Sequence, residues 1–164
     1  MNDLVDLENE MFVFDVYKYF PNNRLELLDI IAKKLKENIY EPYLLDIDTS
    51  KITSFADLFC YVNWNRVYGG IIDTRKIVKL DLRTWKTSNV LSFDSMFYRC
   101  ENLEEIIGVD SWDISNGVNF SLMFAHCKSL HNLDVSNWKT NKYCNRYNMF
   151  EDCYKRPAWH TFPF

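Results

Sequence analysis

Three aligned copies of one unit fill the stretch from Leu80 to Cys153: WKTSNVLSFDSMFYRC (residues 85–100), WDISNGVNFSLMFAHC (residues 112–127) and WKTNKYCNRYNMFEDC (residues 138–153). The steps from Trp to Trp, from Met-Phe to Met-Phe and from Cys to Cys are each 27 and then 26 residues. Residue types that stay in phase over two periods indicate a repeat architecture, in which each unit buries its apolar face only against its neighbours.

Each unit combines short strand patterns with turn chemistry. Apolar and polar residues alternate near the ends of three segments, residues 77–82, 103–109 and 130–135. This pattern predicts short strands that stack into a narrow parallel sheet. The Thr-Ser-Asn residues after Trp favour turns. The Met-Phe and Cys segments are predicted to form one or two helical turns with those side chains facing the core.

A degenerate copy precedes the three, at an offset of 38 residues. Residues 48–52 followed by Leu58-Phe59 match residues 86–90 followed by Met96-Phe97. The excess over one period is about eleven residues, which predicts an insertion within residues 61–73. The insertion contains Trp64, Arg66 and Tyr68, residue types that dominate interface energetics. In the alternative, Tyr61 and Trp64 fold back over the first repeat.

Residues 24–38 have the clearest helical pattern. Leu27, Leu28, Ile31 and Leu35 lie on one face, and lysines fill the opposite face and the last turn, where cations suit the helix dipole. We expect this helix to cover the open end of the repeat core, because a stacked-repeat protein needs a cap. The alternative is a partner-binding helix.

The repeats resemble the BspA-like leucine-rich repeats, whose unit includes L-x-x-L-D-V-S-x-W followed by M-F-x-x-C. Residues 130–138 (LHNLDVSNW) carry the front half, and residues 112–116 (WDISN) with 123–127 (MFAHC) carry the rest. Residues 19–53 also resemble a prefix found before such repeats in phage and mobile-element proteins. The resemblance implies a solenoid used for protein recognition.

Composition and charge exclude several classes of protein. The net charge of −4 gives no basic footprint, so direct nucleic-acid binding is not expected. The chain shows no apolar run of membrane-spanning length and no secretory signal, so we expect a cytoplasmic protein without membrane contact. The five cysteines are then expected to be reduced, with Cys100, Cys127 and Cys153 buried and inert.

The sequence contains no constellation for chemistry. The sequence has no cysteines with zinc-site spacing, no phosphate-binding loop and no serine elbow. No metal, cofactor or catalytic residue is therefore predicted. His126 is adjacent to Cys127, but neighbouring side chains on one short turn usually diverge, which argues against a nucleophilic pair.

Outward positions of the predicted strands would line up into a polar strip, which is either a binding face or a hydrated surface. Aligned on Trp, these positions are Lys79, Asp81, Arg83, Gly108, Asp110, Asn132, Asp134 and Ser136. The residues predicted to bind a partner are Trp64, Arg66, Tyr68, Asp81, Arg83, Asp110 and Asp134.

The predicted fold is α/β: a short leucine-rich-repeat-like solenoid of about four coils with an N-terminal helical cap. Residues 1–42 would carry the cap, residues 43–156 the repeats with the insertion near 61–73, and residues 157–164 an aromatic C-terminal cap or an exposed patch.

The predicted function is a non-catalytic intracellular protein-binding module, monomeric or weakly dimeric. A specific version is a phage-encoded, anti-CRISPR-like inhibitor of a host defence nuclease. The alternative is a self-assembling structural or virion-associated protein.

Overall fold

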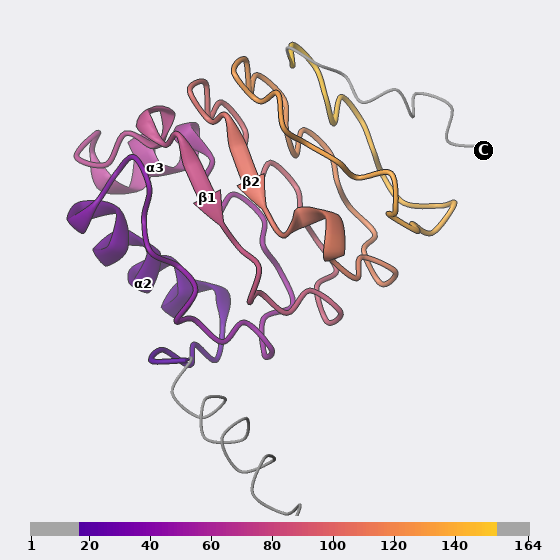
Figure 1. Ribbon diagram of the computed structural model, residues 1–164, viewed down its shortest axis with the longest axis horizontal. Coiled ribbons are helices and arrows are strands. Elements are labelled where there is room, and N and C mark those ends of the chain that lie inside the picture. The colour runs from indigo at the N-terminus through magenta and orange to yellow at the C-terminus, as the bar shows by residue number, and fades with distance from the viewer. Residues whose placement is uncertain (1–16, 154–164) are drawn as a thin grey trace, which may run out of the picture.

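A computed structural model describes residues 17–153 of the chain. In chain order, its elements are α2 (Arg24–Glu37), α3 (Tyr61–Tyr68), a 3-10 helix at Thr74–Lys76, β1 (Lys79–Asp81), β2 (Glu105–Ile107) and a 3-10 helix at Val109–Ser111. Figure 1 shows α2 and α3 at one end of the molecule and the last described residues at the other. The predicted aromatic cap at residues 157–164 lies outside the described residues.

The predicted fold class is wrong. Within residues 17–153, regular structure is limited to two α-helices, short 3-10 helices and one two-stranded parallel sheet, and no solenoid of four coils is formed. The third predicted strand, residues 130–135, makes only a single bridge between Asn132 and Glu105. Gly108, with φ of 91°, turns the chain away after Ile107 and ends β2 there.

The Met-Phe segments are not helical turns either. Each contains residues with left-handed backbone angles at repeating positions: Asp57, Ser95, Arg99, Leu122, His126, Asn148 and Asp152. A residue with positive φ interrupts both a right-handed helix and a strand, so these segments are successive tight turns. Backbone bonds nevertheless join the copies: the N–H of Phe97 donates to the oxygen of Met123 at 2.9 Å, and that of Phe124 to the oxygen of Met149 at 2.9 Å.

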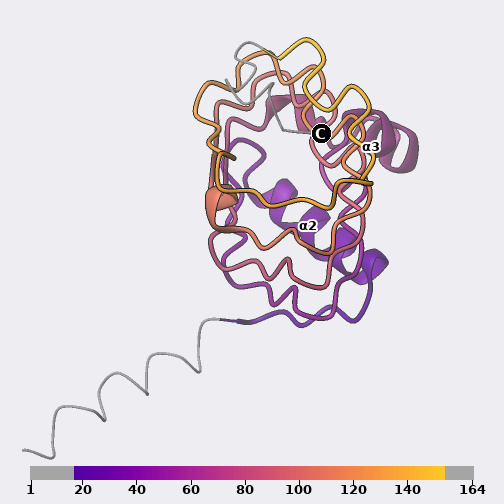
Figure 2. The same cartoon turned by 90° about the vertical axis from the view of Figure 1, so that its right-hand side faces the viewer.

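The repeats lie one over another in Figure 2, and aromatic side chains stack in columns from one repeat to the next. Phe59, Phe97, Phe124 and Phe150 stack in order, with ring centroids 5.6, 5.4 and 5.3 Å apart. The first three rings are fully buried. Offset stacking adds to the apolar burial that stabilises each pair. Repeats therefore pack through side-chain columns and backbone bonds, with little regular sheet.

The helix expected at residues 24–38 is present as α2. Asn23 caps its first turn by accepting from the backbone N–H groups of Leu25 and Glu26. Its buried face carries the predicted leucines and isoleucine, and also Lys34. The Lys34 ammonium is paired with Asp46 at 2.7 Å, which compensates for burying its charge.

Candidate functional site

Trp64 anchors α3 and does not face a partner. Its side chain is fully buried, and its indole N–H donates to the backbone oxygen of Leu58 at 2.7 Å. Tyr68 lies one turn later on the same side of the helix and stacks on the Trp64 ring, with centroids 4.7 Å apart. The prediction that Trp64 contacts a partner is therefore corrected. Trp64 packs against the core, as the alternative predicted for it, and Tyr68 lies on its ring.

The outward side of α3 carries apolar residues that the sequence analysis missed. Val62 and Val67 are 49% and 60% exposed, and Ile71, in the turn after the helix, is 80% exposed. Arg66, which was predicted to bind a partner, is also exposed. A helical reading of residues 61–68 would have placed Val62 and Arg66, four residues apart, on a face away from Trp64, but it would not have separated Val67 from Trp64. We call Val62, Arg66, Val67 and Ile71 the α3 surface.

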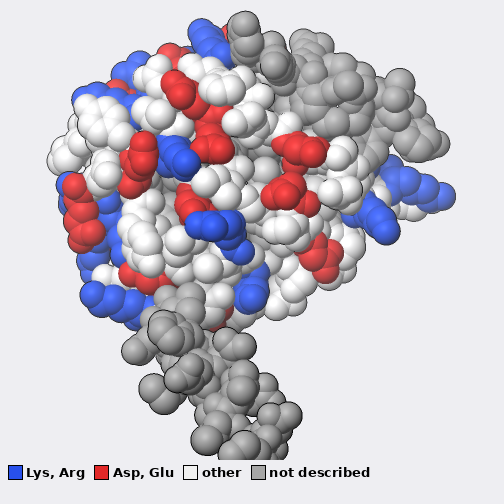
Figure 3. All heavy atoms as spheres, viewed as in Figure 1, with Lys and Arg blue, Asp and Glu red and all other residues white. Residues whose placement is uncertain are grey.

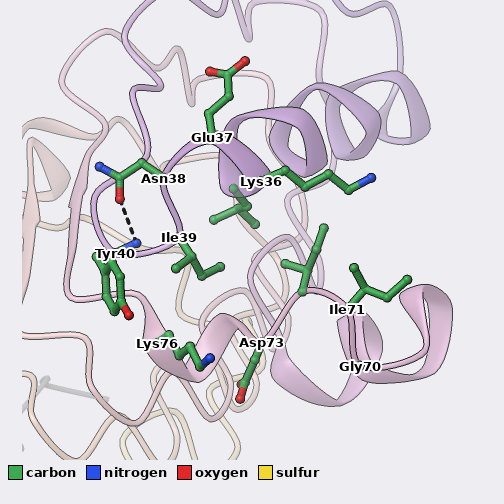
Figure 4. A pocket seen from close by; sticks show the side chains of 11 residues that line it. Lys36, Glu37, Asn38, Ile39, Tyr40, Gly70, Ile71, Asp73 and Lys76 are labelled. Atoms are coloured by element: carbon green, nitrogen blue, oxygen red, sulfur yellow. Dashed lines mark hydrogen bonds between the residues drawn. The ribbon is translucent and has the colours of Figure 1, made fainter.

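A groove of about 510 Å³ adjoins the α3 surface. One wall is the last turn of α2 with the residues that follow it, and the other is the segment after α3 (Figure 4). Its lining residues are Leu35, Lys36, Glu37, Asn38, Ile39, Tyr40, Gly70, Ile71, Ile72, Asp73 and Lys76. Leu35 and Ile72 are buried, whereas Tyr40 and Ile71 are exposed at the rim. The volume is within the range of sites that bind small ligands.

The charges of the groove are unequally compensated. The carboxylate of Asp73 accepts from the Nε and Nη2 of Arg75, each at 2.9 Å, and these bonds lower the pKa of Asp73. Lys36 and Lys76, in contrast, make no ion pair with another described residue. Figure 4 shows the Glu37 carboxylate pointing away from Ile39 and Ile71. The groove lining therefore carries two lysines and two acids beside its apolar side chains.

The strand face is charged, but its charges are largely paired with one another (Figure 3). Lys79 and Glu105, on neighbouring strands, are 2.8 Å apart, and Asp81 is 2.7 Å from Arg83. Partial burial opposes ionisation of Asp81, but hydrogen bonds from Arg83 outweigh it and lower the pKa of Asp81. Two predicted site residues, Asp81 and Arg83, thus neutralise each other.

The predicted alignment of the strip is also corrected. The sheet places Ile107, and not Gly108, opposite Asp81. The extra residue of the 27-residue step lies between β2 and Trp112, where Val109–Ser111 form a 3-10 helix that carries Asp110. Asp110 and Asp134 are both exposed. Asp110 is therefore out of line with Asp81.

The thiols face carbonyl oxygens in the core. Cys100 and Cys127 are fully buried, and burial raises the pKa of both thiols. His126 contacts the carboxylate of Asp152 at 3.1 Å, whereas Cys127 donates to the oxygen of Phe97. These two neighbours therefore point to different partners. Within residues 17–153, no group of three or more His, Cys, Asp or Glu residues is arranged to hold a metal ion.

Neither helix of the described residues combines the length and apolar composition that crossing a membrane requires.

Comparison with known proteins gives one family. No curated protein matches the chain, and no solved structure does. Residues 67–157, more than half of the chain, match the family described as Mycoplasma protein of unknown function, DUF285. On the strength of this match and of the repeats that it covers, the chain belongs to the DUF285 family.

Proposed function

We propose that this chain is a non-catalytic protein-binding module that contacts its partner through the α3 surface and the adjoining groove. One observation carries the proposal: Val62 and Val67 are exposed beside Arg66 on a helix that the buried Trp64 anchors, and Ile71 is exposed in the turn that follows. Clustered exposed apolar residues mark interaction sites, and Arg is enriched among the residues that contribute most to binding.

Contacts with the repeats hold α3 in place, which favours a preformed binding surface over a flexible one. Trp64 is bonded to Leu58, and the backbone N–H of Tyr61 donates to the oxygen of Tyr98 in the next repeat at 3.1 Å. The start of the insertion is therefore joined to the packed repeats. A surface that is already ordered loses less conformational entropy when it binds, so more of the contact energy appears as affinity.

We also propose that the repeats of this chain are BspA-like leucine-rich repeats. It is supported by the repeat motif at residues 130–138 and by the family match over residues 67–157. A role in protein recognition is what this resemblance implies. Because a fold can host many functions, the α3 surface and not the repeat motif is offered as the binding site.

A specific version of the proposal is a phage-encoded protein that inhibits a host defence nuclease by competing for its basic channel. The net charge of −4 and the exposed carboxylates of Asp110 and Asp134 support it. Asp81 and Glu105 contribute little to such competition because their charges are paired with Arg83 and Lys79. Replacing Asp110 and Asp134 with Asn would then abolish inhibition in an assay of nuclease activity.

The test of the general proposal is affinity capture from host lysate with three forms of the tagged protein. They are the wild type, an Arg66→Glu/Val67→Ser variant of the α3 surface, and a Lys139→Glu/Val118→Ser variant as a matched control at exposed positions outside the α3 surface and the groove. We expect one protein to be captured by the wild type and the control and lost by the α3 variant, with circular dichroism showing that all three are folded. Equal capture by the α3 variant, or no specific capture, overturns the proposal.

Sedimentation velocity separates this function from the alternative, a self-assembling structural protein. A binding module is expected to keep one sedimentation coefficient over a wide concentration range. Growth of the particle with concentration, together with capture of only the chain itself, would support assembly.

A further inference from the structure

We propose that residues 154–164 bind the outer edge of the last repeat and close it. This edge is the segment of residues 145–152, at the end of the molecule opposite α2 (Figure 1). The inference goes beyond the proposed function, because it concerns a second surface of the chain and does not involve α3. Of the two predictions made from the sequence for the aromatic C-terminal residues, it selects the cap over the exposed patch.

Backbone N–H groups of one repeat donate to carbonyl oxygens of the next repeat in a fixed register. At the first interface between the aligned copies, bonds of 2.8 to 3.0 Å join Phe93 to Asn119, Ser95 to Ser121, Phe97 to Met123 and Arg99 to Ala125. At the second, bonds of 2.7 to 2.9 Å join Phe120 to Asn145, Leu122 to Tyr147, Phe124 to Met149 and His126 to Glu151. One step of 26 residues further along the chain, the equivalent donors are Arg146, Asn148, Phe150 and Asp152. This register directs their N–H groups away from the stack.

The outer edge of the last repeat therefore offers donors and lacks acceptors. Every backbone oxygen from Asn145 to Glu151 already accepts, either from the preceding repeat or from a turn within the segment. The N–H groups of Asn148 and Asp152 donate to no backbone oxygen within residues 17–153. A segment that binds this edge must supply carbonyl groups, and it needs no N–H group of its own.

A second copy of the chain does not match this edge. Head-to-tail stacking needs the carbonyls of the first repeat, which at the offset of 38 residues are those of Ser54, Ala56, Leu58 and Cys60. The oxygen of Ala56 already accepts from the Arg24 side chain at 2.6 Å, and that of Leu58 from the Trp64 indole at 2.7 Å. The Cys60 oxygen accepts from the backbone N–H of Trp64 at 3.0 Å. Tail-to-tail pairing sets donors against donors.

Residues 154–164 are the occupant closest at hand. They directly follow Cys153, whose N–H donates to the oxygen of Phe150 in the turn that ends the edge. A tethered segment has a far higher effective concentration than a separate partner. The missing N–H groups of Pro157 and Pro163 cost nothing where only carbonyl groups are used.

Pro157 also argues against the simplest alternative, in which these residues continue the stack as a further repeat. In that register Pro157 takes the place of His131, whose N–H donates to the oxygen of Glu104 at 3.4 Å. Proline cannot make this bond. The segment is therefore expected to turn back along residues 145–152.

The aromatic residues of the segment supply the apolar area that holds it in place. Trp159, Phe162 and Phe164 carry large rings, and Phe150, the last ring of the phenylalanine column, offers a surface on which they can stack. An outer segment that contains proline also discourages pairing with other chains, because it presents few donors. Both ends of the stack are then closed, one by α2 and α3 and the other by residues 154–164.

The test is hydrogen exchange of backbone amides in the full ¹⁵N-labelled chain, followed by NMR. The amides of Asn148 and Asp152 are compared with those of Leu122 and His126, their equivalents in the preceding repeat. We expect Asn148 and Asp152 to exchange at least about tenfold more slowly than in an unfolded chain. Because the segment belongs to the same molecule, this protection should not depend on protein concentration.

A variant of the segment shows what provides the protection. Trp159→Ala/Phe162→Ala should speed the exchange of Asn148 and Asp152 by about fivefold or more and leave the Leu122 amide unchanged. The matched control is Tyr143→Ala, which removes an exposed ring outside the edge and should leave all of these amides unchanged.

Three results overturn the inference. They are exchange of Asn148 and Asp152 at unfolded rates in the wild type, unchanged protection in the double variant, and protection that appears only at high concentration, which would identify a second copy as the occupant. If the double variant also exposes the Leu122 amide, nuclear Overhauser contacts in the wild type decide. Contacts between the rings of Trp159 and Phe150 support the closed edge, and their absence refutes it.

Discussion

The thiol of Cys127 donates to the backbone oxygen of Phe97, 3.1 Å away and in the preceding repeat. Cys100 makes the same contact with the oxygen of Phe59 at 3.2 Å. A cysteine at this position fills a small apolar site and also supplies a weak donor directed at the neighbouring copy. This relationship gives a physical reason for the recurrence of Cys at the end of each unit.

The buried thiols should resist alkylation in the native protein. Desolvation raises the pKa of Cys100 and Cys127, and it raises the pKa of Cys60 to about 11. Because the thiolate is the reacting form, iodoacetamide at pH 8 should label the half-exposed Cys144 well before these three, as measured by mass spectrometry of peptides. In urea all of them should react. Rapid native labelling of Cys127 would contradict its position in the core.

Removing one ring from the phenylalanine column should strongly destabilise the protein. Phe124 is fully buried between Phe97 and Phe150, so Phe124→Ala leaves a cavity as well as losing apolar burial. We expect the free energy of unfolding to fall by about 3–5 kcal/mol. Tyr147→Ala, at an exposed position, should change it by less than about 0.5 kcal/mol. Urea denaturation measures both values, and similar losses for the two variants would refute the column.

The sequence was sufficient to predict the repeating units and α2, because periodic apolar residues report which side chains are buried. It was insufficient for the backbone path between them. Arg99 and His126 adopt positive φ although neither residue is a glycine. Gly108 ends β2 at a position where the apolar pattern of a strand continues. Packing between the copies, which no single unit encodes, selects these conformations.

The candidate site was predicted only in part. The insertion near residues 61–73 was identified from the offset between repeats, and Arg66 is exposed there. Residue type alone suggested Trp64 as a contact, but a large ring near a packed core is stabilised more by burial than by exposure. The groove was not predicted at all. It depends on the approach of α2 to the segment after α3, a tertiary contact without a local sequence signal.

Breaking the ion pair between Lys34 and Asp46 should be costly. Only 8% of the Lys34 side chain and 13% of the Asp46 side chain are exposed, and their charged atoms are 2.7 Å apart. Asp46→Ala leaves a buried ammonium without its partner, so we expect a loss of about 3–5 kcal/mol in the free energy of unfolding. Lys33→Ala, on the exposed side of the same helix, is the control. A double Lys34→Met/Asp46→Ala variant should recover part of the loss, and a double variant less stable than Asp46→Ala would contradict this explanation.

Gly108 should tolerate no side chain. A Cβ at this position would lie 2.6 Å from the Cα of Arg83, and φ is 91°. Gly108→Ala therefore combines backbone strain with a steric clash, and it should cost about 2–4 kcal/mol by thermal or urea unfolding. Gly69→Ala separates the two effects, since Gly69 also has positive φ but would place its Cβ in open space. It should cost only about 1 kcal/mol. Equal costs would show that the contact with Arg83 is unimportant.

The contact between His126 and Asp152 should be visible in the titration of the carboxyl group. The hydrogen bond from His126, assisted by Lys128, lowers the pKa of Asp152 from its usual value of 3.8. A carboxylate with a lowered pKa contributes stability above its unfolded-state pKa, and this contribution disappears as pH falls through the folded-state pKa. The contact should therefore stabilise the fold fully at neutral pH, begin to lose this effect as the pH falls to about 3.8, and lose it completely only below the lower pKa of the folded state.

His126→Gly removes the imidazole while tolerating the left-handed backbone at this position, where φ is 61°. In this variant we expect the pKa of Asp152, measured by ¹³C NMR of its carboxyl group, to rise toward 3.8. Lys128→Ala should raise it less, because the Lys128 ammonium is 3.8 Å from the carboxylate whereas the His126 nitrogen is at 3.1 Å. An unchanged pKa in His126→Gly, or a larger change in Lys128→Ala, would show that the imidazole is not the main partner of this carboxylate.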